Sequence, residues 1–533
     1  MKLSLLASAR QNALFKTVRH HNIVYSILMA VLCAACSPKE QARQGEWNVV
    51  KTEGGLISGT LKDSVHIFKG IPFAAPPVDE LRWREPQPVK PWADTLACVA
   101  FGASPIQNDP KPFMMWSQEF ITPATPLSED CLFLNIWTAA TSPEEKRPVL
   151  VWIHGGAFLS GSGACPVYDG EALAKAGIVY VSINYRLGVF GFMAHPELTA
   201  ESEHERSGNY GLLDQVAALQ WIKNNIAAFG GDPSRVTIAG QSAGSMAVQA
   251  LVATPLAKGL FHGAIAQSGA LTGRPSMPLS EAEKTGTALS KKINSESIEA
   301  LRRVSADSLL ALANTLPFGS FFPVVDGYVL PADAGAIFQN KRHNDVPVVT
   351  GWVTGDADLV LGNLQSPTQF KASAQARYGN RSAEFLKRFP SEDEASAKAS
   401  QRKLALLQFA GYPDREWALS NQHNTYVYEF TYVPTDKPGF PNYGAFHTSE
   451  VPFALRTLKQ WDRPWVEADL QVEAYMSSYW INFVKTGDPN GVGLPEWKKY
   501  DAAGGNVQEL GAVSEAKPAK YAAEFEFLKS VNP

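Results

Sequence analysis

The stretch RVTIAGQSAGSMAVQALV, residues 235–252, joins an apolar segment typical of a β-strand to a segment of small and apolar residues typical of a helix. Ser242 lies at the junction, with Gly240 and Gly244 two residues away on either side. A serine at this place either caps the helix or is a nucleophile presented on a sharp strand-to-helix turn. Capping does not explain the paired glycines, whereas a strained turn that is packed closely against its neighbours does. The stretch therefore favours a nucleophile, provided that the rest of the chain forms the sheet that such a turn requires.

Other segments predict that sheet. Almost entirely apolar runs are typical of strands buried on both faces, and three occur in succession: CLFLNIW (131–137), PVLVWIHG (148–155) and IVYVSINY (178–185). Residues 210–229 have apolar residues at helical spacing, and the Gly-Gly-Asp-Pro that follows ends the helix. This alternation predicts an α/β fold with a large central, mostly parallel sheet flanked by helices.

Two later segments have a different composition. Residues 279–314 and 366–416 are charged and helical in pattern, and we expect them to form helical insertions over the active site. Strands are expected at 346–352 and 425–433, and a helix at 470–487 is expected to end the chain. The pattern predicts that residues 47–533 form a single domain.

The N-terminus has the features of an export signal. Basic residues precede an apolar run at 23–35, which is too short to span a hydrocarbon core of about 30 Å but fits the apolar region of a signal peptide. The run ends in Ala-Ala-Cys, and small residues before Cys36 resemble a bacterial lipoprotein cleavage site. We therefore expect a signal peptide at 1–35, a linker at 36–46, and an exported protein. It would be a periplasmic or outer-membrane lipoprotein anchored at Cys36 or, with an ordinary cleaved signal, a secreted protein.

Composition excludes other classes. The chain has 533 residues, is 45% hydrophobic and 19% charged, and has a formal net charge of −4, as expected of a globular protein. It has no basic stripe that would indicate nucleic-acid binding and no cysteine–histidine cluster with metal-ligand spacing. We expect no metal and no organic cofactor. Beyond the export segment, the cysteines are Cys98, Cys131 and Cys165, so they can form at most one disulfide.

A nucleophilic serine needs amide donors for the oxyanion and a histidine base. The segment WIHGGAFLSGSG (152–163) follows a strand and offers Gly155, Gly156 and Ala157 as donors. His154 lies on this loop and is expected to hold its shape. If the chain order is serine, acid, histidine, the base lies downstream. His447 follows a strand and a glycine- and proline-rich loop, which suits a side chain that reaches back across the sheet edge.

The remaining candidates stay open at this point. His343 and His423 also lie downstream of Ser242, although His423 is in a polar, helical run. For the acid, Asp356 and Asp358 both follow the strand expected at 346–352 and could orient the histidine. Asp326 lies near another strand end, but its Asp-Gly sequence is more typical of a turn.

Several motifs together resemble one family. They are GIPFAAPP, LRWREP, SEDCLFLNIW, HGGAF, NYRLGVFGF, GNYGLLDQVAALQWIKNNIAAFGGDP, GQSAG, GAFHTSEVPF and FVKTGDPN. They are similar to those of type-B carboxylesterases, the cholinesterase-like α/β-hydrolases, and within them to bacterial carboxylesterases and fumonisin-type esterases. The resemblance covers almost the whole mature length. It implies an α/β-hydrolase fold and a serine esterase that cleaves small-molecule carboxylic esters through an acyl-enzyme.

The resemblance also implies residue roles. Ser242 would be the nucleophile and His447 the base, and counting from Gly351 places the acid at Asp356. The oxyanion amides would be those of Gly156, Ala157 and Ala243.

The chain departs from the family pattern at three places. Gln241 stands where glutamate is usual, Asp356 where glutamate is commoner, and Pro105 lies near the point where a disulfide partner of Cys131 is expected. The last departure puts a Cys98–Cys131 disulfide in doubt.

The substrate and the reaction have alternatives. Amidase, lipase and carbamate hydrolase activities use the same triad, and a binding protein of this fold would lack the nucleophile. Aromatic residues in two loops are expected to line the substrate pocket and to favour an apolar acyl or alcohol group; they are Phe113, Trp116, Phe120, Phe318, Phe321 and Phe322.

Overall fold

The computed structural model describes residues 48–272, 276–293, 295 and 297–531. The expected signal peptide, Cys36, the linker and Trp47 lie outside these residues. The fold described here is that of the unit Asn48–Pro533.

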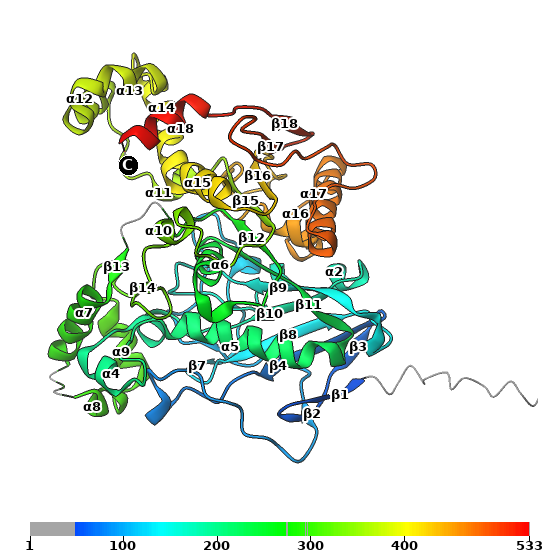
Figure 1. Cartoon of the computed structure of the whole chain (residues 1–533). Helices are drawn as coiled ribbons and strands as arrows, with labels where there is room; N and C mark the ends of the chain where they lie inside the picture. The colour runs from blue at the N-terminus through cyan, green and yellow to red at the C-terminus, as the bar shows by residue number, and fades with distance from the viewer. Residues whose placement is uncertain (1–47, 273–275, 294, 296, 532–533) are drawn as a thin grey trace, which may run out of the picture. The chain divides into compact units, whose positions relative to one another are not determined.

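A large sheet forms the centre of this unit (Figure 1). Eleven strands follow one another in the order β18-β17-β16-β15-β12-β11-β9-β10-β8-β4-β3. Neighbouring strands from β10 to β17 run parallel, whereas β8, β4 and β3 at one end and β18 at the other pair antiparallel. The predicted α/β class with a mostly parallel central sheet is confirmed. The strands are β3 (Thr60–Lys62), β4 (Val65–Pro72), β8 (Phe133–Thr138), β9 (Arg147–Ile153), β10 (Val179–Ile183), β11 (Gly231–Gln241), β12 (Gly263–Gln267), β15 (Val348–Val353), β16 (Thr425–Phe430), β17 (Val507–Leu510) and β18 (Ser514–Lys517).

Both faces of the sheet are buried. Along β9, Val151 and Ile153 belong to one hydrophobic cluster, whereas Leu150 and Trp152 belong to another. Alternate side chains of a strand point to opposite faces, so each face has its own core. Burial on both sides explains why the central strands are apolar throughout.

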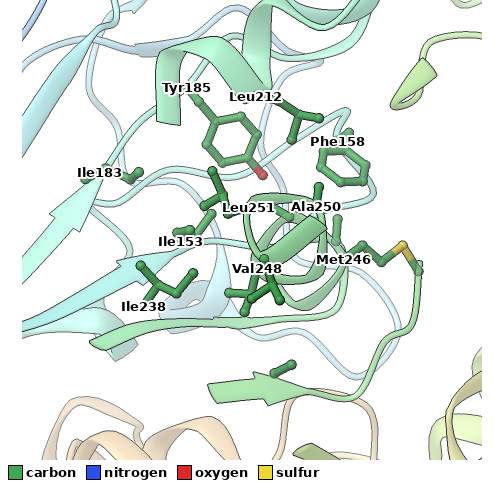
Figure 2. Packing of buried hydrophobic residues seen from close by; sticks show 14 of the residues in the cluster. Ile153, Phe158, Ile183, Tyr185, Leu212, Ile238, Met246, Val248, Ala250 and Leu251 are labelled. Atoms are coloured by element: carbon green, nitrogen blue, oxygen red, sulfur yellow. The ribbon is translucent and has the colours of Figure 1, made fainter. Parts of the chain in front are cut away.

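Helices cover each face. On the first, α5 (Tyr210–Asn225) and α6 (Ala243–Ala253) pack near the middle strands, and every residue of α6 is buried. Figure 2 shows Ile153 and Ile238 from two strands close to Val248 and Leu251 of α6. On the second face lie α2 (Glu171–Lys175), α16 (Val451–Leu455) and α17 (Glu467–Thr486). The sheet thus holds α6, and the turn before it, in a fixed place.

The two predicted helical segments are present. The first contains α7 (Leu279–Lys292), α8 (Ile298–Arg302) and α9 (Ala306–Ala313); the second contains α12 (Pro367–Tyr378), α13 (Ser382–Arg388), α14 (Glu394–Leu406), the π-helix η9 (Leu407–Gly411) and α15 (Tyr412–Ser420). The remaining helices are α3 (Gly188–Phe192), α4 (Pro196–Glu201), α10 (Ala334–Gln339), α11 (Asp356–Val360) and α18 (Ala522–Val531). Short strands outside the main sheet are β1 (Val49–Thr52), β2 (Gly55–Ser58), β5 (Leu96–Ala97), β6 (Ser104–Pro105), β7 (Leu127–Ser128), β13 (Met277–Pro278) and β14 (Val324–Val325).

The C-terminal prediction was incomplete. The helix expected at 470–487 is α17, but β17, β18 and α18 follow it. The strands VQEL and SEAK are short and partly polar. SEAK is the edge strand and reaches solvent, whereas VQEL lies one strand inside and is mostly buried, with Gln508 hydrogen-bonded to Ser514 at 2.8 Å. They lack the apolar run that marks the central strands.

Candidate active site

Ser242 lies on a strained turn at the carboxyl end of β11. The strand ends at Gln241, α6 begins at Ala243, and the serine between them has φ 60° and ψ −123°. A positive φ in a residue other than glycine costs about 1–3 kcal/mol and persists only where the surroundings enforce it. Here the amide of Ser242 donates to the carbonyl oxygen of Gln267 at 2.9 Å, and its own carbonyl accepts from Met246 at 3.0 Å. The turn projects the half-buried serine beyond the sheet edge, as the sequence predicted.

The glycines around Ser242 permit close backbone packing. A Cβ on Gly240 would lie 2.5 Å from the carbonyl oxygen of Gly244, and one on Gly244 would overlap the carbonyl oxygen of Ile153. A Cβ on Gly155 would lie 2.5 Å from the carbonyl oxygen of Gln241. Side chains at these positions would therefore separate the turn, α6 and the loop after β9.

That loop carries the candidate oxyanion donors. Gly156 and Ala157 have φ values of 106° and 56°, and Ala243 is the first residue of α6. Within the described part of the chain, the amides of these three residues donate to no acceptor. Unpartnered amides beside a nucleophile, one of them at a helix N-terminus, are suited to binding an anionic oxygen.

His154 shapes this loop, as expected. Its Nδ1 donates to the carbonyl oxygen of Gly155 at 2.8 Å, and its ring stacks on Tyr185. The hydroxyl of Tyr185 donates to the carbonyl oxygen of His154 at 2.8 Å. Burial lowers the pKa of His154 to about 4, so it stays neutral and holds the backbone.

The acid and the histidine come from two loops joined by a backbone bridge. Gly355, which precedes α11, pairs with Phe446, and its amide donates to the carbonyl oxygen of Ala445 at 2.9 Å. This bridge places the next residues on each loop, Asp356 and His447, against each other. Nδ1 of His447 donates to Oδ1 of Asp356 at 2.6 Å, and both side chains are buried. Oδ2 of Asp356 accepts from the amide of Val353 at 3.1 Å, which fixes the carboxylate.

The alternative acids lie elsewhere. Asp358 is on the same short helix as Asp356 but forms an ion pair with Arg402 at the surface. Asp326 accepts from the backbone amides of Tyr328 and Leu330, each at 3.0 Å, and so stabilises a turn.

The alternative bases also lie away from the acid. His343 is hydrogen-bonded to Asn421 at 3.2 Å, and His423 is exposed. Of the alternatives that the sequence left open, the structure brings Asp356 and His447 together.

The other ring nitrogen of His447 has an unexpected partner. Its Nε2 lies 3.1 Å from the amide nitrogen of Gln241, whose side chain is buried. Among the residues that the structure describes, no hydrogen bond joins Nε2 to the hydroxyl of Ser242. The sequence singled out Gln241 as a departure from the family pattern but did not predict this contact.

Two further carboxylic acids are buried near Asp356. Burial, together with the charge of Asp356, raises the pKa of Glu450 to about 8, and its oxygens are hydrogen-bonded to Ser268 at 2.9 Å and Tyr428 at 2.7 Å. Burial likewise raises the pKa of Asp414 well above its usual value, with Asp356 and Glu450 acting in the same direction. Both shifts favour the protonated, neutral form of these acids, which lie behind Asp356, the carboxyl group that faces His447.

Aromatic side chains flank His447. The rings of Trp116 and Phe409 lie edge-to-face with it, at centroid distances of 6.5 Å and 5.9 Å. Trp116 also donates from Nε1 to Oγ1 of Thr448 at 2.6 Å. Phe409 belongs to the π-helix η9, a form that is frequent at functional sites. The sequence had marked the segment of Trp116 as part of the substrate pocket, but it missed Phe409 because a π-helix has no clear sequence signal.

Three of the other aromatic residues expected at the pocket fall into two groups. Phe322 packs against Phe158 of the oxyanion loop at 5.5 Å, and Phe318 packs against Phe322. Phe120 instead packs against Phe446 and Trp461 in the core. Only some of the expected aromatic residues therefore lie next to the site.

Three further features concern disulfides, metal ions and membrane-spanning helices. Cys98, Cys131 and Cys165 are buried free thiols, so the described residues contain no disulfide. The described residues also hold no group of side chains that could bind a metal ion. Within the same part of the chain, no helix has the length and hydropathy needed to cross a membrane.

Comparison with known proteins identifies the family. The sequence profile of the carboxylesterase family matches residues 46–528. The chain is 34% identical to the fumonisin B1 esterase of Sphingopyxis macrogoltabida, over 85% of this chain and 84% of that relative. It is 35% identical to the para-nitrobenzyl esterase of Bacillus subtilis (strain 168), over 85% and 92% of the two chains. The crystal structure of a carboxylesterase from Geobacillus stearothermophilus matches with a TM-score of 0.78 at 32% identity, over 91% of this chain and 99% of that one.

The fold and the similarities together define a serine hydrolase of the α/β-hydrolase fold. More specifically, the chain belongs to the carboxylesterase family and is a carboxylic-ester hydrolase. The resemblance noted in the sequence is confirmed.

Proposed function

We propose that Ser242, His447 and Asp356 form the catalytic triad of this esterase and that the reaction passes through an acyl-enzyme. His447 accepts the hydroxyl proton of Ser242 as Oγ attacks the ester carbonyl carbon. The carbonyl oxygen becomes an oxyanion, which the amides of Gly156, Ala157 and Ala243 hold. When the tetrahedral intermediate collapses, His447 gives its proton to the leaving alcohol.

Water completes the cycle. His447 takes a proton from water as the water oxygen attacks the acyl carbon, and a second tetrahedral intermediate forms. Its collapse releases the carboxylic acid and returns the proton to Ser242. Asp356 keeps the Nδ1 proton in place throughout and stabilises the imidazolium.

The observation that carries this proposal is the 2.6 Å contact between Nδ1 of His447 and Asp356 at the sheet edge that holds the strained Ser242. Such contacts are also formed by structural ion pairs. Here, however, the free amides of Gly156 and Ala157 lie on a loop packed against the same turn. A nucleophile, a base with its orienting acid and oxyanion donors are thus supplied by neighbouring segments.

We further propose that the substrate is a small-molecule ester with an uncharged, apolar group. The rings of Trp116 and Phe409 lie beside His447 and offer apolar contacts. Burial raises the pKa of Glu450 and of Asp414, which disfavours the negative charge that would attract a cation. Aryl and benzyl esters are therefore the first substrates to test.

The test uses the purified chain from Ser37 onward with p-nitrophenyl and p-nitrobenzyl esters. We expect Ser242→Ala to lower kcat by about 10⁴-fold or more because the nucleophile is lost. Ser245→Ala is the matched control, since Ser245 is buried three residues further along α6 and donates to the carbonyl oxygen of Gly269. In the wild type, phenylmethylsulfonyl fluoride should modify the peptide that contains Ser242. Hydrolysis that survives in Ser242→Ala would refute the assignment.

We also propose that the protein is exported and anchored by a lipid on Cys36, from the apolar run and the Ala-Ala-Cys sequence. Mass spectrometry of the N-terminal peptide from membranes should show a lipid on Cys36. An unmodified N-terminus downstream of position 36 would contradict the anchor and indicate an ordinary signal peptide.

A further inference from the structure

The side chain of Gln241 contacts Nε2 of His447, the ring nitrogen that acts as the base in the proposed reaction. Its amide nitrogen lies 3.1 Å from Nε2 of His447, and the residue is 1% exposed. Gln241 directly precedes Ser242, so the nucleophile and this amide approach the histidine from the same turn. The amide of Gln241 therefore contacts the acceptor that the hydroxyl of the adjacent Ser242 needs in the proposed reaction.

The direction of the hydrogen bond follows from the other side of the ring. Nδ1 carries the proton that faces Asp356, so the neutral ring has its lone pair on Nε2. An amide N–H of Gln241 can donate to that lone pair. One lone pair accepts one well-aligned hydrogen bond, so the hydroxyl of Ser242 and the amide of Gln241 compete for it.

We propose that Gln241 is a positioning residue that caps His447 in the free enzyme and turns its amide when the histidine becomes charged. In the free enzyme the amide N–H donates to Nε2. When Nε2 accepts the proton of Ser242, it becomes a donor, and a half turn of the amide presents Oε1 to it instead. The terminal torsion of glutamine is broad and allows this exchange. The inference rests on the proposed role of His447 as the base.

The residue type matters because an amide can serve both protonation states of the histidine. A glutamate at position 241, usual in the family pattern, can accept from the charged ring but, when ionised, cannot donate to the neutral one. A methionine of similar length offers neither strong hydrogen bond. Replacing Gln241 should therefore change the balance between neutral and charged His447, in addition to any effect on packing.

The other groups near His447 should not contribute to the acid limb of the pH profile. The carboxyl group that faces it is Asp356, and the acids behind Asp356 are Glu450 and Asp414, whose pKa values are raised by burial. Tyr428 is also neutral, because burial raises its pKa well above the usual value. The flanking rings of Trp116 and Phe409 do not titrate. The acid limb of the pH profile should thus report protonation of His447.

The experiment measures kcat/KM against pH for the wild type and for Gln241→Met and Gln241→Glu, because this ratio reports the free enzyme. Gln241→Met removes the hydrogen bonds to both forms of the ring. The bond that the charged ring donates to Oε1 is the stronger of the two because it is charge-assisted, so the acid limb should move to lower pH, by about half a unit. An added carboxylate favours the charged form, so Gln241→Glu should move it to higher pH, by about one unit or more. Gln249→Met, which removes another buried amide of α6, should leave the limb in place.

The outcomes separate this inference from the proposed function. A Gln241→Met profile that superimposes on the wild type after scaling would overturn the cap, because a packing defect lowers activity equally at every pH. Should Gln241→Met fail to fold, the same comparison with Gln241→Glu decides. A wild type without esterase activity, or an active Ser242→Ala, would instead overturn the proposed function itself.

Discussion

The two halves of the candidate site are built in different ways. The turn of the candidate nucleophile is local: β11, Ser242 and the start of α6 are contiguous, and the glycines that permit the turn lie within two residues of the serine. The candidate acid and base, Asp356 and His447, are separated by 91 positions and meet through one backbone bridge, between Gly355 and Phe446. The first half is specified by a short sequence, whereas the second depends on the register of two distant loops.

This difference has a consequence for stability. The turn is enclosed by the sheet and a fully buried helix, so a change there disturbs the core. The bridge lies beyond the ends of β15 and β16 and joins two loops, of which only the loop of Phe446 is anchored in a hydrophobic cluster at the bridge itself. A change at Gly355, on the other loop, should therefore affect catalysis more than folding. Three substitutions test this contrast.

The largest expected effect on the second half is that of Asp356→Asn. An amide at this position no longer holds the Nδ1 proton or stabilises the imidazolium, so kcat should fall by about 10⁴-fold. The matched control is Asp358→Asn on the same helix, which breaks only a surface ion pair with Arg402 and should change kcat less than about threefold. Steady-state kinetics with a p-nitrophenyl ester measures both. Equal losses in the two variants would mean that α11 as a whole, and not the contact with His447, sustains activity.

A matched pair of glycine substitutions tests directly whether the turn and the bridge differ in their effects on folding and catalysis. In Gly355→Ala the new Cβ overlaps the carbonyl oxygen of Ala445, which should separate the loops by about 1 Å and lower kcat by about 10²-fold. In Gly244→Ala it overlaps the carbonyl oxygen of Ile153 inside the core, which should cost about 1–3 kcal/mol of folding free energy. Thermal unfolding followed by circular dichroism, together with kcat, distinguishes the two. If Gly355→Ala unfolds as readily as Gly244→Ala, folding depends equally on both places and the contrast is wrong.

The same contrast explains what could be predicted from the sequence. The strand, serine and helix of the turn are consecutive, and the apolar strands reveal burial on both faces, so the fold and the position of Ser242 could be inferred. Asp356 and Asp358 could not be separated by residue patterns alone, because they are two positions apart on a short helix and the bridge at Gly355 decides which one faces His447.

Contacts between distant segments were also beyond prediction. Phe409 reaches His447 from a π-helix in the second insertion, and the Gln241 contact joins the end of β11 to a loop 206 positions further along the chain. Glu450 carried a weak signal, since it lies three residues after His447. The strands β17 and β18 were missed because both are only four residues long and partly polar, so they lack the apolar run that identifies the central strands.

The smallest expected effect concerns Glu450, one of the two buried acids near Asp356. The pKa of Glu450 is raised from its ordinary 4.5 to about 8, chiefly by burial, so the folded state binds this proton more tightly than the unfolded chain. The free energy of unfolding should therefore decrease as pH rises from about 4.5 to about 8. Glu450→Gln keeps a neutral group that can bond to Ser268 and Tyr428, so it should remove this contribution. Its melting temperature should fall less than that of the wild type between pH 6 and pH 8, with a difference of about 1–2 °C per kcal/mol. Identical pH dependence in the two proteins would show that Glu450 is ionised in the folded state, and the site would then hold a second negative charge behind Asp356.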